Sequence, residues 1–285
     1  IQQDYFPNSI LDKYIKPIIH KNEKVALIVL DCLRYDQAKK LIEKLYTSFD
    51  VKINPALSFI PTTTEYSRNS IFSGLLPNQI KDQFPTEWKE MDSDTSKLNQ
   101  YESYFLKEYC RSLKGNTTVH YEKVIDVEYG KKINKKIKEY RNINLISIVV
   151  NFIDILGHAS IKSKAVKEII PNEKAYRKEV KNWFENSWLY EALLEFKESN
   201  RKIIITSDHG TTLVKRPVIV KADKGTTSGL RYKKGNNLKV STKEGITIKN
   251  PSDYCLPKSH DSDNYIISKS DYFFIYPNDY NHYKK

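Results

Sequence analysis

Three short aliphatic runs, each ending on an aspartate, constrain the fold of this chain more than any other feature. The runs span residues 24–31, 144–154 and 201–208, and their last residues are Asp31, Asp154 and Asp208. Continuous aliphatic stretches of this length are typical of parallel strands that are buried on both faces. Because the carboxyl ends of parallel strands lie along one edge of a sheet, where ligands bind, we expect the three aspartates at that edge.

The segments around these runs predict helices and further strands. They comprise a helical lead-in at residues 1–22, helices at 36–45, 62–74 and 172–198, strands at 51–59, 265–268 and 271–276, and β-hairpins within 212–248. Residues 80–140 are polar and rich in lysine, so we expect an insertion or a lid there. The pattern predicts an α/β fold with a mostly parallel central sheet flanked by helices, formed by residues 23–285 after the lead-in.

The composition is that of a globular protein. The 285 residues are 39% hydrophobic, which allows a large buried core in one or two domains. The 47 Lys and Arg residues exceed the 35 Asp and Glu residues by 12, and such a surplus favours polyanionic partners. Only 8 of these cations are arginines, however, and the planar arginine fork is the preferred group for phosphate and base recognition. Because arginines and aromatic residues are not interleaved, we expect no sequence-specific nucleic-acid binding.

The cysteines and the apolar runs bear on location. Cys32, Cys110 and Cys255 are an odd number without a CxxC pair, which argues for a reducing compartment, and we expect the cytoplasm. No run approaches the roughly 18 apolar residues that a membrane span needs, so we expect no membrane association. The chain begins at Ile1 and contains a single methionine, which predicts a piece of a longer protein.

Histidines accompany two of the three aspartates. The pairs are Asp154-x-x-x-His158 and Asp208-His209. A lone aspartate at a strand end is usually a turn or capping residue, and a lone histidine is usually an ordinary hydrogen-bonded residue. Three carboxylates at one edge would repel each other without cations, and carboxylate with imidazole suits Zn²⁺ or Mn²⁺. The joint pattern therefore favours a metal site, whereas Cys32 is expected only to pack.

Thr64 is a candidate nucleophile. It lies at the predicted start of a helix, where free backbone N–H groups and the helix dipole favour an alkoxide or a phosphate oxygen. A threonine hydroxyl is a poor nucleophile unless a metal assists its deprotonation. Helix capping by Thr62, Thr63 or Thr64 explains the same pattern at least as well.

Several motifs, taken together and in order, resemble a known family. They are Val29-Leu-Asp-Cys-Leu-Arg-Tyr-Asp-Gln37, Glu65-Tyr-Ser-Arg-Asn-Ser-Ile-Phe-Ser-Gly74, Asn151-Phe-Ile-Asp-Ile-Leu-Gly-His158, Ser207-Asp-His-Gly210, Glu173-Lys-Ala-Tyr-Arg177, Leu230-Arg-Tyr-Lys233 and Gly235-Asn-Asn-Leu238. This set resembles the PglZ domain of the alkaline phosphatase superfamily, and most of all the effector domain of PorX-type response regulators. The resemblance covers most of the chain and is weakest at 80–140. PglZ domains also occur in phage-defence systems.

The resemblance implies an alkaline-phosphatase-like fold with two zinc ions. One would be held by Asp31, Thr64, Asp208 and His209, and the other by Asp154, His158 and a later histidine. Thr64 would attack the phosphorus in line, and water would hydrolyse the phosphothreonine.

The C-terminal end departs from the family pattern. The last family ligand is a histidine in a His-Gly-Gly-type motif that this chain does not contain. We therefore expect truncation at the C-terminus, with His260 and His282 as the only late alternatives. The second site would be one ligand short, and we expect weak or single-metal occupancy.

Further residues of the motifs could contact the substrate. Arg231 and Lys233 could face the phosphate, although a structural role in an exposed hairpin is about as probable for them. Arg68 and Asn69, one turn into the nucleophile helix, could reach the site or stabilise the fold.

The resemblance implies a metal-dependent phosphodiesterase or phosphatase. Its substrates would be phosphoesters, including cyclic or oligonucleotide phosphodiesters. It would be the output domain of a two-component response regulator, with a receiver domain upstream and a homodimer as one expected assembly. The alternative is a non-catalytic regulatory or interaction module that keeps the metal-binding fold.

Overall fold

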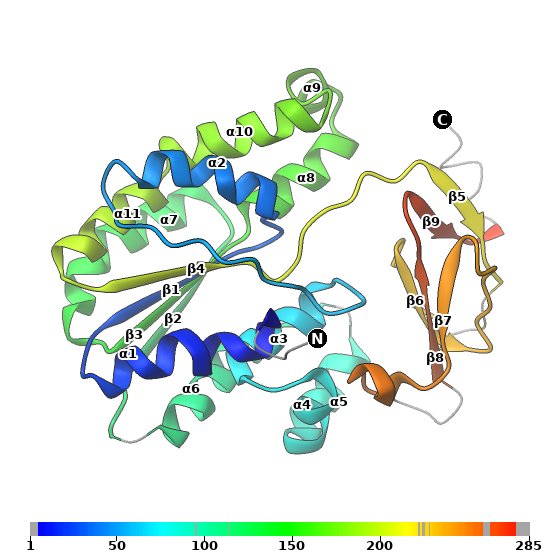
Figure 1. The fold of residues 1–285 in the computed structure, drawn as a ribbon, viewed down its shortest axis with the longest axis horizontal. Coiled ribbons are helices and arrows are strands. Elements are labelled where there is room, and N and C mark those ends of the chain that lie inside the picture. The colour runs from blue at the N-terminus through cyan, green and yellow to red at the C-terminus, as the bar shows by residue number, and fades with distance from the viewer. Residues whose placement is uncertain are drawn as a thin grey trace. The chain divides into compact units, whose positions relative to one another are not determined.

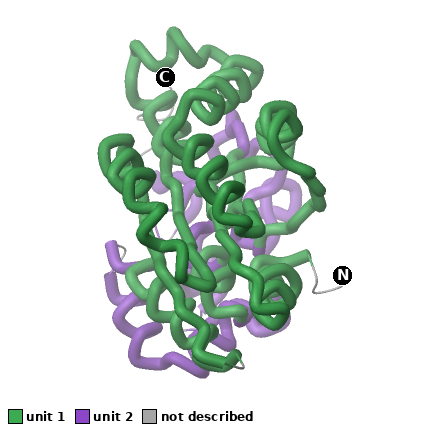
Figure 2. The backbone as a smooth tube through the Cα atoms, turned by 90° about the vertical axis from the view of Figure 1, so that its left-hand side faces the viewer, with its two compact units in different colours: residues 1–58, 67–74, 99–211 green, residues 59–66, 75–98, 212–285 purple. Residues whose placement is uncertain are grey.

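The chain folds into two compact units. The computed structural model describes residues 5–94, 96–113, 115–221, 223, 226–227, 229–258 and 263–277. The first unit is formed by residues 1–58, 67–74 and 99–211, and the second by residues 59–66, 75–98 and 212–285 (Figure 2). The lead-in expected at 1–22 belongs to the first unit.

A four-stranded parallel sheet is the centre of the first unit (Figure 1). Its strands are β1 (Val25–Leu30), β2 (Val119–Val124), β3 (Leu145–Val150) and β4 (Lys202–Thr206), in the order β2-β3-β1-β4. All three pairings are parallel. Strands β1 and β3 are buried at every residue, as expected for central strands covered on both faces. The predicted α/β fold with a parallel central sheet is confirmed.

Helices cover both faces of this sheet (Figure 1). On one side lie α2 (Tyr35–Leu45), α8 (Phe152–Lys162), α10 (Glu173–Glu185) and α11 (Trp188–Glu198), while α1 (Lys16–His20) and α6 (Glu102–Ser112) lie on the other. The helices pack through apolar stripes at i, i+4 spacing, such as Tyr176, Val180 and Phe184 of α10. This stripe joins Ile28 and Ile148 of the sheet in one hydrophobic core.

The N-terminal lead-in is helical from Pro7 onward, as predicted. It consists of η2 (Pro7–Ser9), the π-helical turn η3 (Leu11–Ile15) and α1. Leu11, Ile15 and Ile19 repeat every four residues, and all three are buried.

The predictions for residues 51–59 and 172–198 are wrong. Residues 51–59 form no strand, and Pro55 near their middle lacks the N–H group that a strand ladder needs. The helix expected at 172–198 is two helices, because Asn186 and Ser187 interrupt it between α10 and α11.

The interval 80–140 was expected to be an insertion or a lid, but part of it belongs to the central sheet. It contains the end of α4 (Pro77–Gln83), α5 (Pro85–Ser93), α6, β2, α7 (Val127–Lys136) and the start of η4 (Ile137–Asn142). Strand β2 pairs with β3 along its whole length, with Val119 opposite Leu145. The weak periodicity concealed this strand because five of its six side chains are only half-buried.

The second unit contains two small sheets. One is antiparallel, with β6 (Tyr232–Asn236), β8 (Asp263–Ser268) and β7 (Gly245–Ile248) in the order β6-β8-β7, and in the other β5 (Arg216–Ile219) pairs in parallel with β9 (Tyr272–Ile275). The hairpins predicted within 212–248 are therefore wrong: these strands pair with β8 and β9 instead of with each other. The two predicted C-terminal strands are confirmed as β8 and β9. Their core includes Val218, Ile266 and Phe274.

Helix α3 (Thr64–Ser73) is the predicted nucleophile helix. Gly74 follows it with φ of 71°, a left-handed conformation that commonly ends helices. The first three helical residues belong to the second unit, and Ser67 onward belongs to the first.

No helix among the described residues is both long and apolar enough to cross a membrane.

Candidate metal centre

The strand ends of the central sheet carry the acidic residues that the sequence predicted. Asp31 directly follows β1, and Asp208 comes two residues after β4. Asp154 is not at the end of a strand, because β3 ends at Val150 and Asp154 lies in the first turn of α8.

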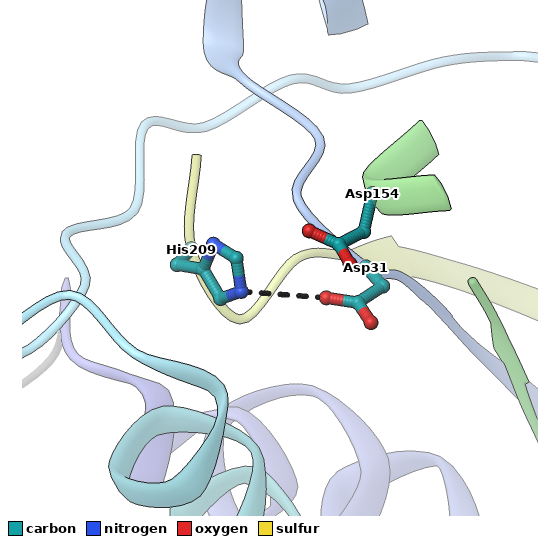
Figure 3. Close-up of side chains that lie close together, drawn as sticks. All are labelled: Asp31, Asp154 and His209. Atoms are coloured by element: carbon teal, nitrogen blue, oxygen red, sulfur yellow. Dashed lines mark ion pairs between the residues drawn. The ribbon is translucent and has the colours of Figure 1, made fainter. Parts of the chain in front are cut away.

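Asp31, Asp154 and His209 come together in space (Figure 3). One ligand atom from each lies within 4.8 Å of the other two. The imidazole Nε2 of His209 is 3.4 Å from Oδ1 of Asp31. Two carboxylates and one imidazole form a donor set that suits a divalent metal ion.

Asp208 lies next to this cluster and is fully buried. Its Oδ1 accepts hydrogen bonds from the backbone N–H groups of Cys32, at 3.2 Å, and His209, at 2.9 Å. Its Oδ2 and the Oδ1 of Asp31 have no hydrogen-bond partner among the described residues. Buried carboxylate oxygens are costly without compensation, so both atoms indicate a place for a cation.

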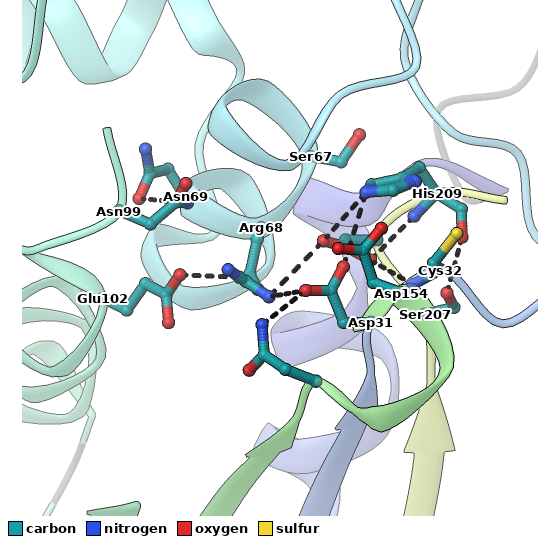
Figure 4. A network of polar contacts seen from close by, with 12 residues as sticks. Asp31, Cys32, Ser67, Arg68, Asn69, Asn99, Glu102, Asp154, Ser207 and His209 are labelled. Atoms are coloured by element: carbon teal, nitrogen blue, oxygen red, sulfur yellow. Dashed lines mark hydrogen bonds and ion pairs between the residues drawn. The ribbon is translucent and has the colours of Figure 1, made fainter. Parts of the chain in front are cut away.

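Asp31, Asp154, Asp208 and His209 together form what we call the acidic edge. A buried arginine already neutralises part of its charge (Figure 4). Arg68 Nη1 donates to Oδ2 of Asp31 at 2.9 Å, and Arg68 Nε donates to Glu102 at 2.6 Å. Asn151 donates to the same Asp31 oxygen at 2.7 Å, and the hydroxyl of Tyr121 donates to Glu102. Oδ2 of Asp31 therefore accepts hydrogen bonds from Arg68 and Asn151, while Oδ1 faces His209.

The pKa values follow from burial and from these charges. Burial raises the pKa of Asp208 and, with the charge of Asp31, that of Asp154. Burial acts in the same direction on Asp31, but the nearby imidazole of His209 and the Arg68 charge hold its pKa below the ordinary value. Burial disfavours the imidazolium of His209, yet Asp31 raises its pKa above the ordinary value. Without a metal, a proton on His209 partly balances the carboxylates.

His158 is placed less closely than expected. Its side chain is 67% exposed, and its Nε2 is 3.6 Å from Oδ2 of Asp154, one helical turn earlier on α8. Asp154 was expected to share a metal with His158, but its nearest group of possible ligands is Asp31 and His209. His260 and His282, the expected alternatives for a third ligand, lie outside the described residues.

The expected substrate-contacting residues have structural partners. Asn69 is buried and faces Asn99, with 3.5 Å between the amide nitrogen of Asn99 and the oxygen of Asn69. Arg231 donates to the backbone carbonyl of Ser270 at 2.8 Å. Lys233 is 1% exposed, and its ammonium lies 4.1 Å from the ring centre of Tyr276. Thr64 is the first residue of α3 and belongs to the second unit.

A cavity in the first unit extends to the acidic edge. Its volume is 910 Å³, and it is lined by α2, β4 and the segment 49–58. Asp208, His209 and Arg34 line it as well. The cavity therefore reaches the acidic edge from within this unit.

Sequence reasoning underrated or missed several residues of the site. Arg68 was considered with Asn69 as one that could reach the site, and it is central to the polar network. Asn151 directly follows β3, so the strand-end argument could have found it. Glu102 carries no sequence signal, because it lies within the weakly periodic interval.

One comparison with known proteins decides the family. The family described as the BREX system PglZ alkaline phosphatase-like domain matches residues 10–284. The chain belongs to the PglZ family. The predicted membership is thereby confirmed, and with the parallel sheet it supports an alkaline-phosphatase-like fold in this PglZ domain. Membership indicates a hydrolase of the phosphoesterase type. No curated protein matches the chain.

Proposed function

We propose that this PglZ domain is a zinc-dependent hydrolase of phosphoesters, with nucleotide-type phosphodiesters as its substrates. The observation that carries the proposal is the cluster of buried Asp31 with half-buried Asp154 and His209 at the carboxyl edge of the parallel sheet. Ligands bind at this edge in open α/β sheets, and family membership supplies the reaction class.

The donor set fits a divalent metal ion. The orphaned oxygens of Asp31 and Asp208 would gain a partner, and carboxylate with imidazole suits Zn²⁺. The residues that would hold two ions are Asp31, Thr64, Asp154, His158, Asp208 and His209. When bound, zinc would stabilise the negative charge of a threonine alkoxide and of phosphoryl oxygens.

Thr64 is the proposed nucleophile. It opens α3, where the N–H groups of the first turn have no acceptor within the helix and can hold phosphate oxygens. Its Oγ1 would form a bond to phosphorus while the bond to the leaving alcohol breaks. Water would then attack the phosphothreonine, releasing the phosphate product and the free hydroxyl.

Hydrolysis of bis(p-nitrophenyl) phosphate tests the proposal. We expect the wild-type chain with added Zn²⁺ to cleave it and Thr64→Ala to lose roughly a thousandfold or more in kcat. Thr62→Ala is the matched control, because Thr62 is an exposed hydroxyl two residues earlier, and it should retain activity. Removal of metal with EDTA should abolish cleavage, and Zn²⁺ should restore it.

The outcomes separate the alternatives. Equal rates for wild type and Thr64→Ala would exclude this nucleophile. Stoichiometric zinc without cleavage of phosphomonoesters or phosphodiesters would favour the non-catalytic module. p-Nitrophenyl phosphate, tested in parallel, distinguishes a phosphatase from a phosphodiesterase.

The biological setting is a separate part of the proposal. The sequence motifs lead us to infer the output domain of a cytoplasmic response regulator, with an upstream receiver domain and a homodimeric state, whereas the family description names the BREX system. The reading frame upstream of Ile1 decides between these settings. A receiver domain with a phosphorylatable aspartate would support the first, and its absence would exclude it.

A further inference from the structure

Ser58 forms hydrogen bonds with two segments that carry groups of the proposed function. Its hydroxyl donates to the backbone carbonyl of Asp208 at 2.8 Å. The same oxygen lies 2.8 Å from the hydroxyl oxygen of Ser67 on α3. Ser58, Ser67 and Asp208 all belong to the first unit, so both contacts lie within one compact part of the chain.

The direction of these bonds follows from the number of protons. A serine hydroxyl has one proton to donate, and a carbonyl oxygen can only accept. Ser58 gives its proton to the carbonyl of Asp208, so Ser67 is the donor in the bond between the two hydroxyls. Ser67 is 0% exposed, and a buried donor without an acceptor is costly. The three groups therefore form a hydrogen-bonded chain that runs from α3 to Asp208.

Each end of this hydrogen-bonded chain lies next to a group of the proposed reaction. At one end, Asp208 and His209 are proposed metal ligands, and Ser207 donates to the carbonyl of His209 at 2.8 Å (Figure 4). At the other end, Ser67 comes three residues after Thr64 in the same helix. Residues at this spacing lie on the same face of a helix. Ser58 therefore connects the segment of two ligands with the helix that begins at the proposed nucleophile.

We propose that Ser58 is a positioning residue that holds the backbone of Asp208 and His209 at a fixed distance from α3. This inference rests on the proposed function and adds to it a side chain that touches neither metal nor substrate. Removing side chains that support metal ligands typically lowers metal affinity or activity 10–100-fold. The alternative is a purely structural role, in which the hydroxyl contributes only to stability.

Variants that remove or keep the hydroxyl of Ser58 test the proposal. Ser58→Ala should lower kcat for bis(p-nitrophenyl) phosphate roughly 10-fold or more with little change in KM. It should also weaken Zn²⁺ binding roughly 10-fold, measured by competition with a chromophoric chelator. Ser58→Thr keeps a hydroxyl on the same carbon and should restore most of both. A purely structural role would instead lower the unfolding midpoint and leave kcat and zinc affinity of the folded protein unchanged.

A double-mutant cycle tests whether Ser58 and Ser67 act through the same bond. Ser67→Ala removes the donor and should also lower kcat, and it keeps the test valid if Ser58→Ala does not fold. Because one hydrogen-bonded chain contains both hydroxyls, the double variant should be no slower than Ser58→Ala alone. Losses of kcat that multiply in the double variant would overturn the proposal.

Ser48→Ala is the matched control. Ser48 is also half-buried, and its hydroxyl lies 3.1 Å from that of Tyr190 on α11. This variant should keep the wild-type kcat and zinc affinity.

The outcomes separate this proposal from the proposed function. A folded Ser58→Ala with wild-type kcat and zinc affinity would overturn the role of Ser58 and leave the proposed function standing. A wild type that binds Zn²⁺ but cleaves no phosphoester would overturn the proposed catalysis, and the zinc affinities would still decide the role of Ser58. A folded wild type that binds no zinc would overturn both.

Discussion

Arg68 Nη1 lies 2.9 Å from Oδ2 of Asp31, and both side chains are 3% exposed. The same guanidinium donates to Glu102 at 2.6 Å and lies 3.8 Å from Oδ2 of Asp208. Burial opposes the charge of Arg68, but the surrounding carboxylates raise its pKa further above the ordinary value. A permanent cation is thus built into the acidic edge, and it holds one oxygen of Asp31 in place.

Replacing Arg68 should destabilise the fold strongly. Arg68→Ala leaves Glu102 and Asp31 buried without their cation, and breaking buried pairs of this kind costs about 3–5 kcal/mol. Urea denaturation followed by circular dichroism measures the free energy of unfolding. Arg111→Ala is the control, because Arg111 pairs with Glu108 on the surface and its loss should cost less than about 1 kcal/mol. Equal losses for the two variants would contradict the role of Arg68.

The hydroxyl of Tyr176 on α10 should determine how much an alanine at Gly157 on α8 changes the free energy of unfolding. A Cβ added to Gly157 would lie 3.1 Å from the hydroxyl of Tyr176, which donates to the carbonyl of Ile153 at 2.9 Å. Alanine normally stabilises a helix by up to about 1 kcal/mol relative to glycine, but here the hydroxyl must move. We expect Gly157→Ala to be more favourable in a Tyr176→Phe background than in the wild type. A double-mutant cycle measures this coupling, and additive effects would exclude it.

The contact between α7 and α11 should not tolerate a side chain at Gly130. A Cβ there would lie 2.2 Å from the ring of Trp188, which is buried. We expect Gly130→Ala to lower the free energy of unfolding by roughly 1–3 kcal/mol, because the ring cannot move without disturbing the core. Lys131→Ala, at the next and exposed position, should change it by less than about 0.5 kcal/mol. Thermal unfolding of both variants is sufficient to compare them.

Stability should depend on pH in opposite directions with and without metal. Burial raises the pKa of Asp208 to about 6, so its charged form weakens the metal-free fold, and this penalty is lost as pH falls from that value to the ordinary carboxyl pKa of about 4. The raised pKa of His209 acts in the same direction, because its stabilising charge is fully present below the unfolded pKa and is lost as pH rises through the folded one. The lowered pKa of Asp31 opposes them only below about pH 4. The stabilisation by Zn²⁺ should instead grow with pH, since protons compete for the ligands.

Unfolding midpoints from pH 4 to 8, with and without Zn²⁺, test this dependence. Asp208→Asn is the control, because the amide has nearly the same shape but no charge to gain. The metal-free wild type should lose stability relative to Asp208→Asn as pH rises from about 4 to about 6, and the difference should then level off. A wild type that gains stability relative to this variant over that range would contradict the assignment.

Local sequence patterns predicted the central sheet because its strands are buried on both faces. Val25–Leu30 and Leu145–Val150 have aliphatic side chains on nearly every position, which few other elements require. Residues 119–124 were missed because His120, Glu122 and Lys123 give this edge strand a polar composition. Residues 51–59 were wrongly predicted as a strand, because their apolar residues were given more importance than Pro55, which cannot donate to a strand ladder.

The candidate site was predictable only where its residues follow a strand. Asp31 and Asp208 share that signal, and the neighbouring histidine drew attention to Asp154, although Asp154 lies on a helix. Arg68 and Glu102 contribute through a contact across 34 positions, which no local pattern encodes. The left-handed backbone of Cys32 could not be predicted from the sequence, because it is a property of the folded chain.

The order of strands in the central sheet also fixes when the metal centre can exist during synthesis. Val25 pairs with Leu145 on one side and with Lys202 on the other, so β1 leaves the ribosome long before either neighbour. At roughly 5–20 residues per second, β1 waits on the order of ten seconds for β4. Since Asp31, Asp154 and His209 form the cluster together, the nascent chain cannot complete it until His209 has been made. Metal capture at this cluster would therefore report that the first unit has been completed, before residues 212–285 of the second unit have been made.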